Sequence, residues 1–78
     1  MKYPQNLSQL MPGQHARVTH IDTVGAMRRR LMDLGLTLDT EIMCLGRSPF
    51  GDPSAYLIRG AVIAIRAKDS QNIIIETE

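Results

Sequence analysis

The stretch VGAMRRRLMDLGL, from Val24 to Leu36, decides the fold because it is the only part of the chain with a helical period. Its apolar residues recur at spacings of three, four and three residues, which places them on one stripe of an α-helix. The residues of this stripe are Val24, Met27, Leu31 and Leu34. The pattern predicts a single short amphipathic helix whose stripe packs against the rest of the protein.

The other residues of this stretch predict a charged outer face and a defined end. Arg29 and Asp33 are four residues apart, the spacing of an ion pair along one face of a helix. Gly35 stands where many helices end in the left-handed conformation, which glycine adopts without steric cost. Leu36 would then fold back onto Leu31, because an apolar contact of this kind accompanies such a cap.

The chain has 78 residues, enough for one domain over residues 1–78, with a core expected at about residues 7–76. A chain of this length buries only about 60% of the surface of its unfolded state, so its stability margin is small. The single cysteine, Cys44, suits a reducing compartment. Neither a signal peptide nor a run of about 20 apolar residues that would span a membrane is visible. These features predict a cytoplasmic protein.

Outside the helix, alternating polarity and turn residues predict five short strands. They are expected at residues 14–21, 41–45, 56–59, 61–67 and 72–76. In the first strand, Ala16 and Val18 would point inward. The alternation fails at His20-Ile21, which indicates that the strand ends or bulges there.

The strand pattern favours a closed sheet, because closure removes the exposed edges of an open one. The run Ile73–Ile75 has no polar face, which is typical of a strand that is central or covered on both faces. We therefore expect a mainly β fold, a small barrel of about five strands with one packed helix. Leu7, Leu10 and Met11 would lie across one end of the barrel, and residues 1–6 would form a frayed start.

Residues spread over most of the chain match one known family in order and spacing. They are the run RRRLMDLGL, Gly51-Asp52-Pro53, Tyr56, Arg59-Gly60, Ala64-Ile65-Arg66, Asp69 and Ile73. Together, over about Leu7 to Ile75, they resemble the FeoA family (ferrous iron transport protein A). Two positions differ: Leu38-Asp39 stands where the family usually has Pro-Gly, and Phe50 where it commonly has an aliphatic residue. Neither change removes an essential chemical group.

The resemblance implies a small SH3-like barrel with the helix inserted after the first strand. It also implies a cytoplasmic accessory protein of ferrous iron uptake. Such a protein would act as a protein-interaction module on the cytosolic part of a membrane ferrous iron transporter, which carries a G-protein domain. Neither insertion into the membrane nor binding of nucleic acid would be expected. A similar domain closes some iron-dependent transcriptional repressors.

The residues themselves predict no catalysis and no cofactor, because no nucleophile with a base, phosphate-binding glycine loop or carboxylate pair is present. His15 and His20 are the candidate metal ligands, yet on a regular strand they point to opposite faces. An inward Cys44 is more often a small buried hydrophobic residue than a ligand. We therefore expect no metal site.

Two surfaces are candidates for partner binding. The run Arg28–Arg30 is either an ordinary solvated helix face or a docking surface for an acidic partner or an anionic membrane surface. In the loop 48–53, Phe50 either anchors a partner or folds back as a lid over one barrel end. The candidate partner-binding residues are Arg28, Arg29, Leu31, Met32, Phe50, Gly51, Asp52 and Pro53. Leu31 is also expected to belong to the core.

Three functions follow from these patterns. The first is the protein-interaction module of ferrous iron uptake. The second is a nucleic-acid-binding small barrel, although a net charge of +1 and only three aromatic residues weigh against it. The third is a transcription-regulatory domain of an iron-dependent repressor, although no helix-turn-helix precedes the barrel in this sequence.

Overall fold

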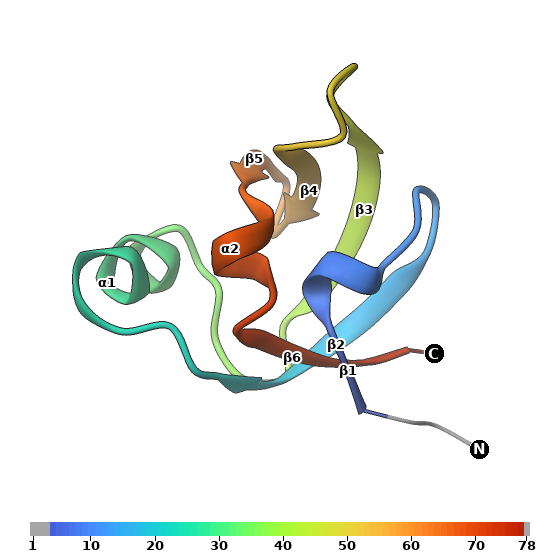
Figure 1. Cartoon of the computed structure of the whole chain (residues 1–78). Coiled ribbons are helices and arrows are strands. Elements are labelled where there is room, and N and C mark those ends of the chain that lie inside the picture. Colours follow the sequence, from blue (N-terminus) through green and yellow to red (C-terminus); the bar gives the residue numbers. More distant parts are fainter. Residues whose placement is uncertain (1–3, 78) are drawn as a thin grey trace.

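The computed structural model describes residues 4–77, and Figure 1 shows their arrangement. In chain order the elements are β1 Pro4–Asn6, the 3₁₀ helix η1 Leu7–Gln9, β2 His15–Ile21, α1 Gly25–Asp33, β3 Glu41–Arg47, β4 Ser54–Ile58, β5 Ala61–Ile65, α2 Ala67–Ser70 and β6 Ile73–Thr77. The fold is mainly β with one short amphipathic helix, as the sequence predicts. Residues 1–3 of the predicted frayed start lie outside the described residues.

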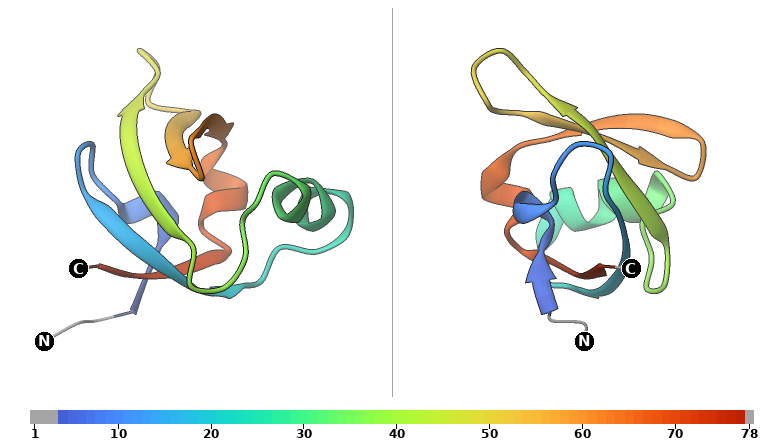
Figure 2. Two further views of the ribbon diagram at one scale, coloured as in Figure 1. Left: turned by 180° about the vertical axis from the view of Figure 1, so that it is seen from behind. Right: turned by 90° about the vertical axis from the view of Figure 1, so that its right-hand side faces the viewer.

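The six strands form one antiparallel sheet in the order β1-β6-β2-β3-β4-β5. The sheet curls around its core, as the two views of Figure 2 show. The expected closure of the barrel is wrong, because the terminal strands β1 and β5 do not pair with each other. The short helices η1 and α2 contact each other. Strand β6 lies between β1 and β2, which confirms that Ile73–Ile75 belongs to a central strand.

Residues 4–6 form a strand that the side-chain pattern does not predict. Strand β1 pairs antiparallel with β6, and Gln5 lies opposite Ile75. Pairing of this kind uses backbone groups, which are the same for polar and apolar residues. The expectation of a frayed start is therefore wrong for residues 4–6, and helix α1 follows the second strand of the sheet rather than the first.

The core is built from the inward residues of the sheet together with residues of η1, α1 and the loops. It contains Leu7, Leu10, Ala16, Val18, Ile21, Leu31, Leu36, Ile42, Cys44, Tyr56, Ile58, Ile63, Ile65, Ile73 and Ile75. The predicted inward positions of Ala16, Val18 and Cys44 are confirmed. The expectation for Met11 is wrong: it follows the end of η1, and 55% of its surface is exposed.

The end of α1 has the predicted cap. Gly35 has a φ of 101°, in the left-handed region. Its N–H donates to the Met32 carbonyl oxygen at 3.0 Å, and the Leu36 N–H donates to the Leu31 carbonyl oxygen at 2.9 Å. These two bonds define a Schellman motif, and both leucines are buried. The helical stretch therefore ends as its sequence indicates.

The predicted apolar stripe of α1 is only half correct. Leu31 is buried and Met27 packs against the core, but 80% of Val24 and 37% of Leu34 are exposed. Val24 is extended, with φ −129° and ψ 167°, so it precedes the helix and the helical period does not apply to it. Leu34 is the C-capping residue and follows the last helical residue, Asp33. The expected ion pair between Arg29 and Asp33 is also absent from the described structure, whose recorded ion pairs involve other residues.

Several strand bounds differ from the predicted ones. A register shift between Val18 and His20 confirms the bulge near the end of β2. Strand β3 continues to Arg47 and strand β4 already begins at Ser54, because backbone pairing between them continues beyond the apolar residues. Strand β5 ends at Ile65, since Ala67 already begins the short helix α2.

Tyr56 links the sheet to the N-terminal segment. Its ring is buried, and its Oη donates to the Leu7 carbonyl oxygen over a long 3.4 Å. Burial is the largest cause that raises the pKa of Tyr56 above its ordinary value, against a lowering contribution from hydrogen bonding to Ser54. The folded protein therefore keeps the phenol protonated to a higher pH than the unfolded chain does.

This raised pKa predicts a loss of stability in alkali. Below about pH 10 the Tyr56 phenol is protonated in both the folded and the unfolded state, so its stabilising contribution is fully present. Above about pH 10 the unfolded state binds fewer protons than the folded state, so the free energy of unfolding falls as pH rises. We expect Tyr56→Phe to make this decline shallower in urea unfolding curves between pH 9 and about pH 11. At pH 7 the variant should lose at most about 1 kcal/mol, because the lost hydrogen bond is long. An unchanged alkaline slope would contradict the assignment.

Candidate functional site

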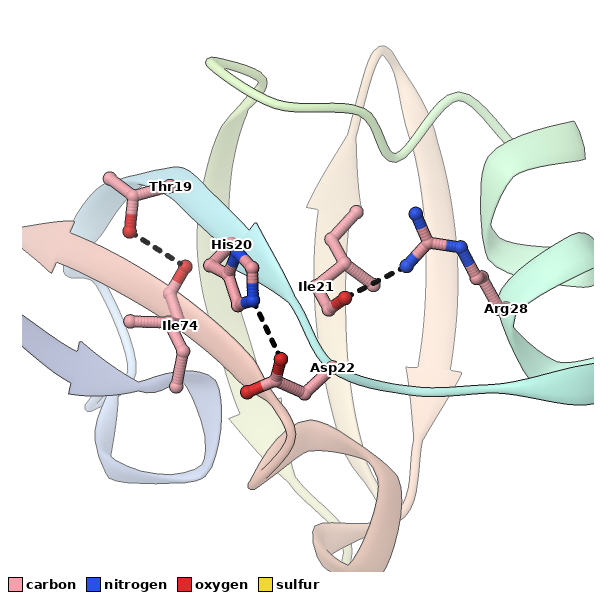
Figure 3. Close-up of polar contacts among 6 residues, drawn as sticks. All are labelled: Thr19, His20, Ile21, Asp22, Arg28 and Ile74. Atoms are coloured by element: carbon pink, nitrogen blue, oxygen red, sulfur yellow. Dashed lines mark hydrogen bonds and ion pairs between the residues drawn. The ribbon is translucent and has the colours of Figure 1, made fainter.

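Helix α1 is fastened to the end of strand β2 by an arginine. The Arg28 Nη1 atom donates a hydrogen bond to the Ile21 carbonyl oxygen at 2.8 Å (Figure 3). Arg28, the first arginine of the predicted run Arg28–Arg30, thus has a structural role within the protein, although the residue is exposed. Its contact with a partner stays a prediction, and a change at Arg28 would disturb the position of α1.

The bulge of β2 lies beside this contact. Thr19 Oγ1 donates to the Ile74 carbonyl oxygen at 3.3 Å, and His20 Nε2 lies 2.7 Å from Asp22 Oδ1 (Figure 3). The His20 and Asp22 side chains are exposed. Among residues 4–77 no group of three or more histidine, cysteine, aspartate or glutamate side chains is placed to hold a metal ion.

The other end of α1 is fastened to the β4–β5 turn. The Arg59 Nε atom donates to the Gly35 carbonyl oxygen at 2.9 Å. The Arg59 side chain lies so close to Gly35 that a Cβ atom on this glycine would be 2.7 Å from Arg59 Cδ. Gly35 is therefore required both for its left-handed backbone and for the approach of Arg59.

The outer surface of α1 combines basic and apolar side chains. Arg29 is exposed, and 46% of the Met32 surface is accessible. Val24 and Leu34, which the stripe pattern placed inside, add exposed apolar surface at the two ends of the helix. Leu31 lies beneath this surface in the core. We name Arg29 and Met32, which are three residues apart and therefore neighbours on the helix surface, the helix face.

The loop between β3 and β4 presents an exposed aromatic ring. Phe50 is 95% exposed, so the alternative in which it folds back as a lid is wrong. The loop nevertheless has a defined shape, because the Ser48 N–H donates to the Pro53 carbonyl oxygen at 3.0 Å and the Gly51 N–H donates to the Ser48 carbonyl oxygen at 2.8 Å. Because the loop already has a defined shape, it would lose little conformational entropy when a partner binds the exposed ring.

Asp52 ties this loop to helix α2. Its Oδ1 accepts a hydrogen bond from the Ala67 N–H at 2.8 Å, and its Oδ2 lies 4.0 Å from Arg66 Nη1. Asp52 is thus used within the protein, which gives a structural reason for the Gly51-Asp52-Pro53 run. Whether it also contacts a partner stays a prediction.

The two predicted surfaces do not form one patch. In Figures 1 and 2 the yellow β3–β4 loop extends away from the core on a different side from α1. Only Pro53, at the base of the loop, reaches the helix, where it lines a groove of about 250 Å³ together with Met27 and Leu31.

Two of the grooves on the described surface bring together residues that the sequence pattern does not connect. The groove between α1 and β5 is also lined by Arg30, which belongs to the predicted run Arg28–Arg30, and by Arg66 and Asp69, which are not among the predicted contact residues. A larger groove of about 510 Å³ crosses the outer face of β2, β3 and β4 and includes His15 and Glu41. The outward positions of these residues are visible in the alternation, but their neighbours depend on which strands pair.

Comparison with known proteins places this architecture in a family. The model of the FeoA domain matches residues 5–77. The chain belongs to the FeoA family. The solution structure of FeoA from Chlorobium tepidum is similar at 34% identity and a TM-score of 0.89, over 94% of this chain and 70% of that one. A search of curated proteins finds no match to this chain.

More distant structures share the fold alone. FeoA from Stenotrophomonas maltophilia, solved with zinc and described as an SH3 domain protein, is 23% identical with a TM-score of 0.80, over 91% of this chain and 88% of that one. A manganese-dependent transcriptional repressor is 22% identical with a TM-score of 0.85, over 96% of this chain but only 37% of that one. The FeoA fold of this chain is thus SH3-like, with a sheet that is not closed.

FeoA membership supports an accessory role in ferrous iron transport. The family is one of small accessory domains rather than of enzymes. Within residues 4–77, no helix of this FeoA domain has the length and apolar character required to cross a membrane.

Proposed function

We propose that this FeoA protein is a cytoplasmic accessory factor of ferrous iron uptake that docks onto the cytosolic, G-protein-containing part of a membrane ferrous iron transporter. The observation that carries this proposal is the FeoA family match over residues 5–77. The protein would act by occupying a partner surface, without chemistry or a cofactor of its own. Residues 1–78 would act as a single domain with a core at about 7–76.

Two exposed surfaces support docking. Phe50 stands alone on a shaped loop, and a rigid exposed aromatic ring is the kind of residue that dominates binding energy at interfaces. The helix face adds Met32, an adaptable apolar contact, beside Arg29. Gly51, Asp52 and Pro53 hold the loop, and Leu31 supports the helix face from beneath, so their contribution to binding would be indirect.

The proposal predicts that Phe50→Ser weakens binding to the purified cytosolic region of the transporter by roughly 30-fold or more, the effect of losing an interface hot spot. Isothermal titration calorimetry measures the affinity. Leu38→Ser is the matched control, since Leu38 is an exposed apolar residue, 58% accessible, in the connector after α1. The control should bind as the wild type does, and both variants should keep the wild-type melting temperature.

The helix face is tested by Arg29→Glu in the same titration. Arg29 is preferable to Arg28, whose guanidinium also holds α1 to Ile21. Weaker binding with a smaller salt dependence would support an acidic partner surface. If the wild-type protein did not bind the cytosolic region, docking would be refuted.

A regulatory role at DNA is the second candidate, favoured by the fold shared with the manganese-dependent repressor. Salt-titrated binding to duplex DNA separates the two functions. Salt-sensitive DNA binding without contact to the transporter region would favour this candidate, because phosphate contacts weaken steeply as salt rises.

A further inference from the structure

Strand β5 leaves one edge of the sheet unpaired. It is the last strand in the sheet order, so only β4 pairs with it. Strands β4 and β5 are joined by a two-residue turn in which Arg59 and Gly60 have φ angles of 49° and 81°. Positive φ at both positions defines a type I′ hairpin, whose flanking residues, Ile58 and Ala61, form a hydrogen-bonded pair.

This hairpin register determines which backbone groups of β5 are free. In an antiparallel pair, hydrogen-bonded and non-hydrogen-bonded residue pairs alternate. Since Ala61 opposite Ile58 is a bonded pair, Val62 and Ala64 occupy non-bonded positions, and their N–H and C=O groups point away from β4. Within residues 4–77 no other segment pairs with this edge. Val62 and Ala64 are both exposed.

A groove lies along this edge. Its walls are Ile63, Ala64 and Ile65 on β5 and Met27 and Leu31 on α1, around a volume of about 250 Å³. Ala64, one of the two residues with outward peptide groups, lines this partly apolar channel between strand and helix, and Val62 directly precedes Ile63, the first β5 residue of its wall. Such a channel receives an extended chain, whose backbone pairs with the strand while alternate side chains enter the groove.

The charges at the groove favour an acidic occupant. Arg30 on α1 and Arg66 after β5 line it, against one acidic residue, Asp69. Arg66 is 63% exposed, and Asp52 lies at the long distance of 4.0 Å from it. Arg59 adds a further positive charge at the other end of β5.

A second copy of this chain is a poor occupant of the same edge. Two antiparallel β5 strands would bring Arg66 of one copy close to the Arg59-Gly60 turn of the other, at both ends of the pair. Like charges held near each other oppose such pairing. The same arginines attract carboxylates on a different chain.

We propose that the free edge of β5 binds an extended, acidic segment of a partner protein as a further strand of the sheet, between β5 and α1. Val62 and Ala64 supply the backbone hydrogen bonds, and Arg30 and Arg66 select carboxylates. The identity of the natural partner rests on the proposed function, which makes the transporter's cytosolic region its source. The mode of binding does not rest on it.

The first test uses peptides, independently of the transporter. The ¹⁵N-labelled protein is titrated with the blocked peptides Glu-Val-Glu-Val-Glu and Lys-Val-Lys-Val-Lys. We expect the acidic peptide to shift the amide signals of Val62 and Ala64 and to slow their hydrogen exchange at low salt, with the basic peptide at least about tenfold weaker. No shift at these amides, or equal effects of the two peptides, would overturn the proposal. Dimerisation in sedimentation through this edge would also overturn it.

The second test removes one outward N–H. Val62→Pro deletes a donor that faces away from β4, a position at which edge strands accept proline, so the fold should be kept. Val62→Thr is the matched control because it keeps the N–H. We expect Val62→Pro to weaken binding of the acidic peptide and of the transporter region by roughly tenfold, as for one lost hydrogen bond, and Val62→Thr to bind normally.

The two proposals fail in different ways. If the transporter region bound the wild type and Val62→Pro equally well, the β5 edge would be refuted and docking would stand. If the acidic peptide behaved as expected but the transporter region did not bind, the edge would stand as a strand-binding site and the proposed partner would be wrong. Circular dichroism of each variant confirms that the fold is intact.

Discussion

Leu31→Ala is expected to lower the free energy of unfolding by about 2–5 kcal/mol, the cost of removing a large side chain from a packed core. Leu31 is the only buried residue of α1, with 1% of its surface accessible. Only Met27 assists it, from a half-buried position. Because a domain of this size has a small margin of stability, the variant should melt at a markedly lower temperature or be largely unfolded at 37 °C. Urea unfolding followed by circular dichroism measures the change.

Val24→Ala is the matched control for this prediction. Helical spacing puts Val24 and Leu31 on the same stripe, but 80% of Val24 is exposed. We expect its replacement to change the stability by no more than about 0.5 kcal/mol. Comparable losses in the two variants would show that Val24 packs inward and that α1 begins earlier than Gly25. A fully folded Leu31→Ala variant would contradict the anchoring of α1 through this one side chain.

Gly35→Ala is expected to destabilise the protein by about 2–3 kcal/mol, through two separate effects. A φ of 101° is unfavourable for alanine and costs about 1–2 kcal/mol. The added Cβ would also lie 2.7 Å from Arg59 Cδ, so the arginine must move and weaken its hydrogen bond to the Gly35 carbonyl oxygen. Both effects loosen the C-terminal end of α1. Thermal unfolding measures their sum.

A second glycine separates the two effects. Gly13 has a φ of 88°, but a Cβ there would meet no atom within 4 Å. Gly13→Ala should therefore show the backbone cost alone. Adding Arg59→Ala to Gly35→Ala should remove the steric part, so the two substitutions together should cost less than the sum of their separate effects. Equal losses for Gly13→Ala and Gly35→Ala, with additivity at Arg59, would contradict a role for the Arg59 contact.

Local features of the fold were predictable from the sequence because they depend on neighbouring residues. The cap at Gly35 requires one glycine and two leucines within six positions, and these are visible in the printed chain. The inward positions of Ala16 and Val18 follow from alternation alone. The bulge in β2 appears as the failure of that alternation at His20-Ile21.

The candidate site was less predictable, because exposure is a property of the whole molecule. The exposed Phe50 was one of two alternatives that the sequence left equal. The internal bond of Arg28 to the Ile21 carbonyl oxygen requires α1 to lie beside the end of β2. The groove that joins Arg30 and Arg66 requires α1 and β5 to face each other, and no spacing in the chain encodes that approach.

The sequence by itself determined the helix, its cap, most of the strands and the FeoA family, since each depends on local periodicity or on the order of motif residues. The tertiary structure alone decided that Val24 lies outside, that residues 4–6 complete the sheet and that the sheet stays open at β5. Backbone pairing is the reason for the last two. Every residue except proline offers the same N–H and C=O groups, so side-chain patterns do not reveal which edges are paired.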